Sequence, residues 1–320
     1  MTRRVLLRAA SGPSIGMGHV MRARSIAQEV ASRGGEPLLI VDEGVTARTL
    51  VGEGFPVSHE GEAPDWTTRP AAGAWLDGFR DWTPELAALA GAGTRTFLAE
   101  NRGPCRERCD RLVYPALHYV PDAWDVAHAE RVLAGAAWIP LPREVRSMRP
   151  SAVRDVDLLV TFGGSDPRRL TERVLSALAG SGLRTVVAVG PHMAERRDAI
   201  RSACASGADV RVLRPGTPLP RWFARSRAAL TAVGTTLYEL AYLGVPALLL
   251  ANYGSDREAL EWYAAHGPHL PLGVAAELSQ EGLRAAITTG VRELATRTAS
   301  PVPELGDGAT RLAETLLEAA

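Results

Sequence analysis

The stretch DLLVTFGGSDP, residues 157–167, decides the fold. It begins as a mostly apolar run, ends in a glycine turn, and is followed by a helical pattern from about Arg168 to Ala179. A short buried strand that enters a helix through such a turn is the repeating unit of parallel α/β sheets. Further strands are predicted, each followed by a helical pattern, at 185–189, 210–213, 228–231 and 247–250. This part of the chain is therefore predicted to form a parallel α/β domain.

The N-terminal part repeats this organisation. A first strand begins at 5–8 and runs through a glycine-bearing turn, 12–18, into a helical pattern. Further strands are expected at 38–41, 74–77 and 94–98. The alternation of strands and helices predicts a second α/β domain.

A proline-rich segment separates the two parts. It reads IPLPREVRSMRPSAV, residues 139–153, and its three prolines and three arginines show no periodicity, which is typical of a linker. We therefore place the domain boundaries at 1–145 and 146–307. The remaining segment, 308–320, is predicted to be an amphipathic helix that could pack back across the linker.

The composition excludes several classes of function. The 36 basic residues are balanced by 36 acidic ones, which argues against a nucleic-acid partner. Every basic residue is arginine, so mechanisms that need a lysine, such as Schiff-base catalysis or a phosphate-binding P-loop, are excluded. The three cysteines lack companion ligands for zinc, and we expect neither a metal nor a cofactor. Since no apolar run approaches the roughly 18 residues of a membrane span, we expect a cytoplasmic protein.

The segment GMGHVMR, residues 16–22, leads from the first predicted strand into the first predicted helix. Gly16 and Gly18 would let the backbone approach a phosphate, so a dinucleotide site stays open as an alternative. At a helix N-terminus, His19 would tend to be neutral and able to accept a proton. The alternative is a histidine that caps the backbone or faces solvent. Arg22 lies on the same helix face and could order the loop or bind an anion.

Two later glycine loops also suit a phosphate. The first follows the strand quoted above and offers backbone N–H groups and a hydroxyl: Gly163, Gly164 and Ser165. The second opens a predicted helix: Gly234, Thr235 and Thr236. Glu239, further along that helix, could accept two hydrogen bonds from a ribose diol. The alternatives are a plain turn capped by Ser165 or Asp166, and an exposed acid at Glu239.

Four motifs, in order over nearly the whole chain, resemble those of a known family. GMGHVMR resembles its GxGHxxR motif, TFGGSDP its second glycine loop, GTTLYELAYLGVP its GG(S/T)T–E–LGVP segment, and ELGDGATRL its terminal Gly-Asp-Gly-Ala-x-Arg helix. The family is that of the UDP-sugar hydrolases of pseudaminic acid biosynthesis, which act on UDP-2,4-diacetamido-2,4,6-trideoxy-β-L-altropyranose. It belongs to the glycosyltransferase-B superfamily and is related to the N-acetylglucosaminyltransferase that makes lipid II.

The resemblance implies an α/β fold of two Rossmann-like domains that face a central cleft. The nucleotide, UDP by resemblance, would be held mainly by the second domain, with the two later glycine loops along the diphosphate and Glu239 on the ribose. His19 would deprotonate a water that attacks the anomeric carbon with inversion, releasing UDP and a free amino- or deoxy-sugar. Asp77 is the second candidate catalytic residue, as a group that orients His19 or binds the sugar.

The chain departs from the family on the sugar side. Leu76-Asp77-Gly78-Phe79 stands where the hydrolases carry Asp-Ser-Tyr or Asp-His-Tyr, so the acid is kept and both partners are lost. Asn252 is kept after the LGVP strand as a candidate sugar-binding residue, but the glutamine that normally follows is absent.

These departures leave alternative functions open. The first is an inverting glycosyltransferase of the same fold, in which His19 serves a small-molecule acceptor instead of water. The others are a nucleotide-sugar 2-epimerase and a protein that binds a nucleotide without turning it over. The sequence does not decide the sugar, the base or the oligomeric state.

Overall fold

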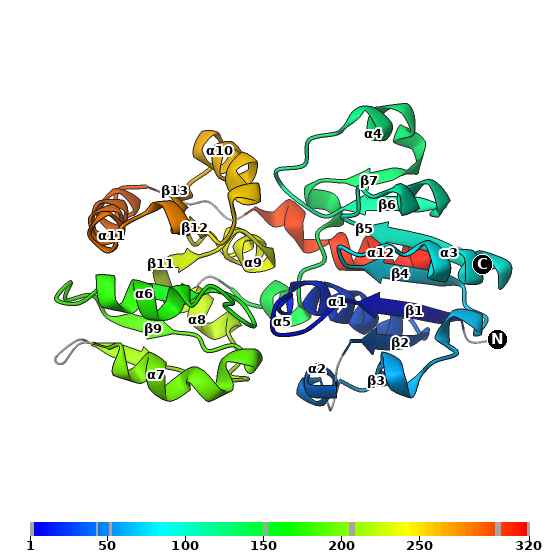
Figure 1. Ribbon diagram of the computed structural model, residues 1–320, viewed down its shortest axis with the longest axis horizontal. Helices are drawn as coiled ribbons and strands as arrows, with labels where there is room; N and C mark the ends of the chain where they lie inside the picture. The colour runs from blue at the N-terminus through cyan, green and yellow to red at the C-terminus, as the bar shows by residue number, and fades with distance from the viewer. Residues whose placement is uncertain are drawn as a thin grey trace. The chain divides into compact units, whose positions relative to one another are not determined.

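The computed structural model describes residues 3–42, 44–50, 53–149, 151, 153–204, 209–297 and 302–318. The chain forms two compact units, shown in Figure 1. Unit 1 comprises Met1–Arg143 and Glu304–Ala320, and unit 2 comprises Glu144–Pro303.

Unit 1 is built on a parallel sheet. Among the described residues the sheet has seven strands in the order β3-β2-β1-β4-β5-β6-β7. The strands are β1 (Arg4–Ala9), β2 (Glu36–Val41), β3 (Val57–His59), β4 (Gly73–Asp77), β5 (Arg95–Ala99), β6 (Arg111–Tyr114) and β7 (Val132–Ala134). The helices are α1 (Gly18–Ser32), α2 (Gly44–Thr49), α3 (Thr83–Gly91), α4 (Ala123–Ala127) and α12 (Gly308–Leu317), and α5 (Arg143–Arg146) begins where the unit ends.

Helices cover both faces of this sheet, because successive side chains of a strand point to opposite sides. Val5, Leu7 and Ala9 of β1 pack in one core with α1 and α12, whereas Leu6 belongs to the core on the side of α3. The α12 helix, red in Figure 1, lies against α1 and β4 although it comes from the end of the chain. Its first residue, Gly308, approaches the backbone of Ile139 so closely that a Cβ would lie 2.2 Å from the carbonyl oxygen.

Unit 2 repeats this design. Among the described residues its parallel sheet has six strands in the order β10-β9-β8-β11-β12-β13. The strands are β8 (Val156–Thr161), β9 (Thr185–Val187), β10 (Val210–Val212), β11 (Ser226–Thr231), β12 (Ala247–Ala251) and β13 (Leu270–Val274). The helices are α6 (Leu170–Ala177), α7 (Arg197–Ser202), α8 (Pro220–Arg225), α9 (Thr235–Tyr242), α10 (Arg257–Ala265) and α11 (Gln280–Leu294).

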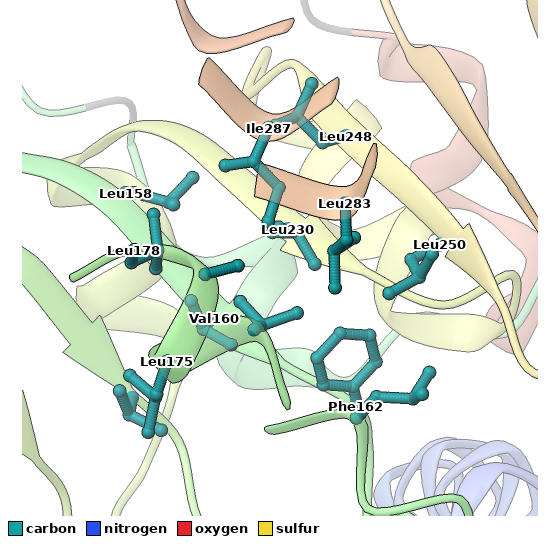
Figure 2. Close-up of a cluster of buried hydrophobic side chains, with 14 of the residues drawn as sticks. Leu158, Val160, Phe162, Leu175, Leu178, Leu230, Leu248, Leu250, Leu283 and Ile287 are labelled. Carbon is teal, nitrogen blue, oxygen red and sulfur yellow. The ribbon is translucent and has the colours of Figure 1, made fainter. Parts of the chain in front are cut away.

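One apolar core of unit 2 fixes the start of a candidate loop. Leu158 and Val160 of β8 pack with Leu283 and Ile287 of α11, as Figure 2 shows. Phe162, which follows β8 directly, places its ring in the same cluster and is 5% exposed. Since Phe162 is anchored in the core, the backbone of the glycines that follow it begins from a fixed point.

Both sheets are doubly wound, which confirms the predicted fold class. In each, the first strand of the unit lies beside the fourth, and the chain proceeds outward from that pair in both directions. Open sheets of this kind bind ligands outside the carboxyl ends of the strands at the point where the order reverses. That point lies between β1 and β4 in unit 1, and between β8 and β11 in unit 2.

Candidate active site

His19 and Asp77 meet at the reversal point of unit 1. Ala9, the last residue of β1, is aligned with Asp77, the last residue of β4. After β1 the chain makes a turn and enters α1, whose second residue is His19. His19 Nδ1 lies 2.7 Å from Asp77 Oδ1, and the two residues are 6% and 0% exposed. The contact therefore joins residues 58 positions apart in the chain.

Arg22 completes this cluster from the same helix. Its Nε lies 3.0 Å from Asp77 Oδ2 and its Nη2 lies 2.8 Å from Asp77 Oδ1, which is a two-pronged contact. Arg22 Nη2 is also 2.9 Å from His19 Nδ1. Arg22 Nη2 and His19 Nδ1 come this close to each other because both donate to the same oxygen, Asp77 Oδ1.

The electrostatics of this cluster keep Asp77 ionised. Burial alone would raise the pKa of Asp77, but Arg22 and His19 outweigh it and hold the pKa below its ordinary value. An ionised Asp77 accepts the proton on His19 Nδ1, and Nε2 is then the ring nitrogen left to take a proton from another molecule. The arrangement can therefore act as a general base whose tautomer is fixed by a buried carboxylate.

A second carboxylate holds Arg22 from the other side. Glu100 follows β5, and its Oε2 lies 2.6 Å from Arg22 Nη1. Burial would lower the pKa of Arg22, but Asp77 and Glu100 reverse this effect and raise it. Glu100 was not among the residues selected from the sequence, since it belongs to no recognisable motif.

The turn between β1 and α1 is hydrogen-bonded to Asp42, the residue that follows β2. Ser11 donates its backbone N–H to Asp42 Oδ2 over 2.7 Å, and its hydroxyl accepts from the Asp42 N–H over 3.1 Å. Asp42 also pairs with the fully buried Arg8 of β1. Gly16 adopts a φ of +86°, a conformation that favours glycine, and Gly18 begins α1. Gly16 and Gly18 thus shape the turn that delivers His19, and their proposed contact with substrate stays a prediction.

The loop after Asp77 presents an aromatic ring to His19. Phe79 contacts the His19 ring edge-on, with centroids 5.0 Å apart, and is 76% exposed. The loop itself is anchored, because Trp82 Nε1 donates to the Gly78 carbonyl over 3.0 Å and Asn101 Nδ2 donates to the Arg80 carbonyl over 2.8 Å. Phe79 is therefore an apolar side chain held at the edge of the His19 site.

In unit 2, the reversal point brings the two predicted glycine loops together. Thr161 of β8 is aligned with Thr231 of β11, and each strand is followed by one of the loops. Gly190 lies directly against the first loop, since a Cβ there would be 2.3 Å from the Gly164 carbonyl oxygen. The same oxygen accepts the His192 N–H over 3.1 Å. Gly163 has a φ of +76°, and Ser165 is buried.

The first loop differs from the sequence-based expectation in one respect. The helix begins at Leu170 instead of Arg168, so Gly163, Gly164 and Ser165 precede its first turn by several residues. The side chain of the buried Asp166 lies at the start of α6, where it accepts hydrogen bonds from the N–H groups of Leu170 and Thr171 over 2.7 Å and 3.0 Å. The start of α6 is thereby occupied by a carboxylate. An anion would have to use the N–H groups of the loop itself.

The second loop opens directly into a helix. Gly234 is the N-cap of α9 and has no side chain with which to cap it, and Thr235 and Thr236 are its first two residues. Glu239 lies half-buried one turn further along. The N-terminus of α9 is therefore the helix end that suits an anion at this reversal point.

Asn252 follows β12, the strand next to β11. Its Oδ1 is buried and has no hydrogen-bond partner among the described residues. It is one of several such buried polar atoms in the described part of the chain, and it can accept a hydrogen bond from a water or a ligand. The neighbouring Tyr253 lies under the guanidinium of Arg168, 5.0 Å from its ring centroid. This contact joins the loop after β8 to the loop after β12.

The described part of the chain contains neither a membrane-spanning helix nor a cluster of metal ligands. No helix there is both long and apolar enough to cross a membrane. No group of three or more His, Cys, Asp or Glu side chains there is placed to hold a metal ion.

Comparison by sequence gives little. The chain matches no protein-family model. It is 26% identical over 134 residues to the spore coat polysaccharide biosynthesis protein SpsG of Bacillus subtilis (strain 168). That match covers 40% of this chain and 38% of SpsG, so it spans well under half of the relative.

Comparison by structure covers nearly the whole chain. MurG of Acinetobacter baumannii is similar with a TM-score of 0.61 and 14% identity, over 99% of both chains. The spinosyn rhamnosyltransferase SpnG complexed with thymidine diphosphate has a TM-score of 0.61 and 15% identity, over 98% of this chain and 96% of its own. LpCGTa in complex with UDP has a TM-score of 0.59 and 13% identity, over 99% and 94%. With two doubly wound α/β units and these structural neighbours, the chain has the glycosyltransferase-B fold.

Proposed function

We propose that this protein is a glycosyltransferase that moves a sugar from a nucleoside diphosphate to a small-molecule acceptor with inversion at the anomeric carbon. The observation that carries the proposal is the buried hydrogen bond between His19 and Asp77 at the reversal point of unit 1. A base of this kind is what an inverting transfer requires of the protein. The proposal thus takes up the alternative left open by the sequence.

In the proposed reaction, His19 Nε2 takes the proton from the acceptor hydroxyl or amine as its oxygen or nitrogen bonds to the anomeric carbon. The bond from that carbon to the diphosphate oxygen breaks at the opposite face, and the electron pair leaves with the nucleoside diphosphate. Asp77 keeps the Nδ1 proton in place and stabilises the imidazolium that forms.

The nucleotide is assigned to unit 2. The N–H groups of the first loop (Gly163, Gly164 and Ser165) and the start of α9 (Gly234, Thr235 and Thr236) would receive the diphosphate and stabilise it as it leaves. Glu239 would accept hydrogen bonds from the ribose, and the unpartnered Asn252 Oδ1 would accept one from a sugar hydroxyl. Two structural neighbours are described as complexes with thymidine diphosphate and UDP, so both bases are candidates for this chain.

Hydrolysis is the second candidate, because the GMGHVMR and LGVP motifs resemble those of nucleotide-sugar hydrolases and the same base could activate water. Transfer ranks first because several structural neighbours are transferases by name, including spinosyn forosaminyltransferase and spinosyn rhamnosyltransferase. The two reactions differ in one measurable respect: a hydrolase releases the nucleoside diphosphate at full rate without an acceptor.

The first experiment measures binding by calorimetry with UDP, TDP, CDP, GDP and NADPH. We expect one diphosphate to bind with a Kd in the micromolar range, equivalent to about −8 kcal/mol, and Glu239→Ala to weaken it by about 1–3 kcal/mol. Binding of NADPH alone would support the dinucleotide alternative and refute the proposal.

The second experiment measures turnover with sugars on the base that binds. Release of the diphosphate is followed with and without a panel of alcohol and amine acceptors, for the wild type and for His19→Ala. Transfer predicts release that depends on an acceptor, whereas hydrolysis predicts release without one. Under both, His19→Ala loses turnover and keeps nucleotide affinity; a variant that still turns over at the wild-type rate would remove His19 from the mechanism.

A further inference from the structure

Glu100 occupies an unusual backbone position beside the His19 cluster. It is one of the non-glycine residues with a positive φ, at +48°, and its N–H donates to the Val113 carbonyl over 2.9 Å. A left-handed conformation is unfavourable for a residue with a Cβ, and such positions cluster where function imposes them. Here the conformation directs the Glu100 carboxylate to Arg22 Nη1, 2.6 Å away.

The strand register explains why Glu100 is within reach. Ala9, Asp77 and Ala99 are aligned across β1, β4 and β5, so the residues that follow these strands emerge at the same level of the sheet. Arg22 therefore lies between two carboxylates, with Asp77 on one side and Glu100 on the other.

The charges of this cluster balance only when His19 carries a proton. With a neutral imidazole, the positive charge of Arg22 faces the negative charges of Asp77 and Glu100, and the sum is −1. With an imidazolium the sum is zero. Without Glu100, the remaining pair of Arg22 and Asp77 would already be neutral, and a proton on His19 would leave an excess positive charge in a buried site.

The other charged side chains at this edge of the sheet have different partners. Arg8 pairs with Asp42 and Glu60. Arg80 pairs with Glu85, and Arg102 lies over the ring of Tyr114. Among the contacts that the structure gives for His19 and Arg22, the negative charges are therefore those of Asp77 and Glu100.

We propose that Glu100 is a positioning residue whose carboxylate, acting through Arg22, stabilises the protonated form of His19 during proton transfer. The inference rests on the proposed function, since it assumes that His19 accepts a proton in the reaction. Glu100 also prevents Arg22 from neutralising Asp77 completely, so Asp77 remains an effective partner for the imidazolium.

The test compares Glu100→Gln with a matched control. Glutamine can still accept a hydrogen bond from Arg22, so this change removes the charge and keeps the contact. Glu53→Gln is the control, because Glu53 forms a comparable ion pair, 2.7 Å long, with Arg24 of α1. None of the contacts that the structure describes for His19 involves Glu53. The side chains of Glu100 and Glu53 are 23% and 16% exposed, so the two positions are also similarly buried.

The main measurement is the pH dependence of kcat/KM. In Glu100→Gln we expect the acid limb to move to lower pH by about half a unit to one unit, because the imidazolium is less stable. The plateau should fall by at most about threefold to tenfold, because a weaker base transfers the proton less well. KM for the nucleotide sugar should stay the same, and Glu53→Gln should behave as the wild type.

A merely structural role predicts a different pattern. Glu100→Gln would then lower the melting temperature and the active fraction without moving the acid limb, and this result would overturn the proposal. Equal displacement of the limb in Glu53→Gln would overturn it as well.

An independent measurement separates this inference from the proposed function. The His19 ring is titrated by NMR in the wild type, Glu100→Gln and Glu53→Gln, with His19→Gln used to assign the signal. The midpoint should fall only in Glu100→Gln, whether or not a substrate has been found. If the midpoint falls and no nucleotide sugar is turned over, the proposed function fails and the coupling stands; if the midpoint does not move, the coupling fails.

Discussion

Replacing Asp77 by asparagine tests the centre of the proposed mechanism. Asp77 is wholly buried and accepts from three donors, His19 Nδ1, Arg22 Nε and Arg22 Nη2, at 2.7, 3.0 and 2.8 Å. An asparagine has one acceptor oxygen and an NH₂ group that must face one of these donors. The change therefore removes the charge that fixes the Nδ1 proton and places two donors against each other.

The expected losses can be estimated separately for turnover and for stability. A misplaced general base costs about 10² to 10⁴ in rate, which is about 3–5 kcal/mol in the activation free energy. Removing one partner of a buried ion pair costs about 3–5 kcal/mol of unfolding free energy, and Glu100, which still pairs with Arg22, should keep the cost near the lower value.

The assay is a double-mutant cycle with His19→Ala, measured as the release of nucleoside diphosphate. Nucleotide binding and urea unfolding on the same samples give the folded fraction. If Asp77 acts through His19, Asp77→Asn should lower turnover further by less than about threefold in the His19→Ala background. Turnover of Asp77→Asn within about tenfold of the wild type, or an equal loss in both backgrounds, would refute this reasoning.

Two further predictions concern stability and the nucleotide loop. His269 is buried, accepts the Ala247 N–H over 3.2 Å, and has a pKa lowered to about 4 by burial. As the pH falls from about 6.5 towards 4, the unfolded chain binds a proton that the folded chain does not, so the unfolding free energy should decrease by up to about 1.4 kcal/mol per pH unit. Urea unfolding at pH 7, 6 and 5 should show a smaller decrease in His269→Gln, and equal slopes would contradict this. In Gly190→Ala, the new Cβ would lie 2.3 Å from the Gly164 carbonyl oxygen, so the first loop must shift. We expect the Kd of the nucleoside diphosphate to rise about tenfold in calorimetry; an unchanged Kd would show that this loop does not hold the diphosphate.

The fold class could be predicted from the sequence because its signals are local. The apolar run before Gly163 and the helical pattern after it correspond to β8 and α6, and the first strand and turn correspond to β1 and the start of α1. The strands β3, β6, β7 and β13 escaped prediction. Their length alone does not explain this, because β9 and β10 are as short as β3 and β7 and were predicted. The start of α6 shifted because Asp166 caps the helix from four residues away.

The candidate site could be predicted only in part. His19 follows from its place at a helix start, and Asp77 came from the resemblance to a family. The role of Glu100 could not be predicted from the sequence. Its contact with Arg22 depends on the register of three strands and on a positive φ that no sequence motif indicates. Strand order and register are determined by the packing of the whole sheet, and short-range patterns do not reveal them.

The two units place different side chains at the same position of one topology. At the reversal point of unit 1, the last residue of β4 and the segments that follow β1 and β5 supply charged and titratable side chains that contact one another. At the reversal point of unit 2, the segments that follow β8 and β11 contain mainly glycines and hydroxyl-bearing residues, and Gly234 gives α9 no side-chain cap. A buried carboxylate and imidazole suit proton transfer, whereas N–H groups at a helix start suit a diphosphate. Because the chain has no lysine to neutralise phosphate, we expect the affinity for the nucleotide to depend on these N–H groups and on arginine, and therefore on the backbone geometry that Gly163 and Gly190 permit.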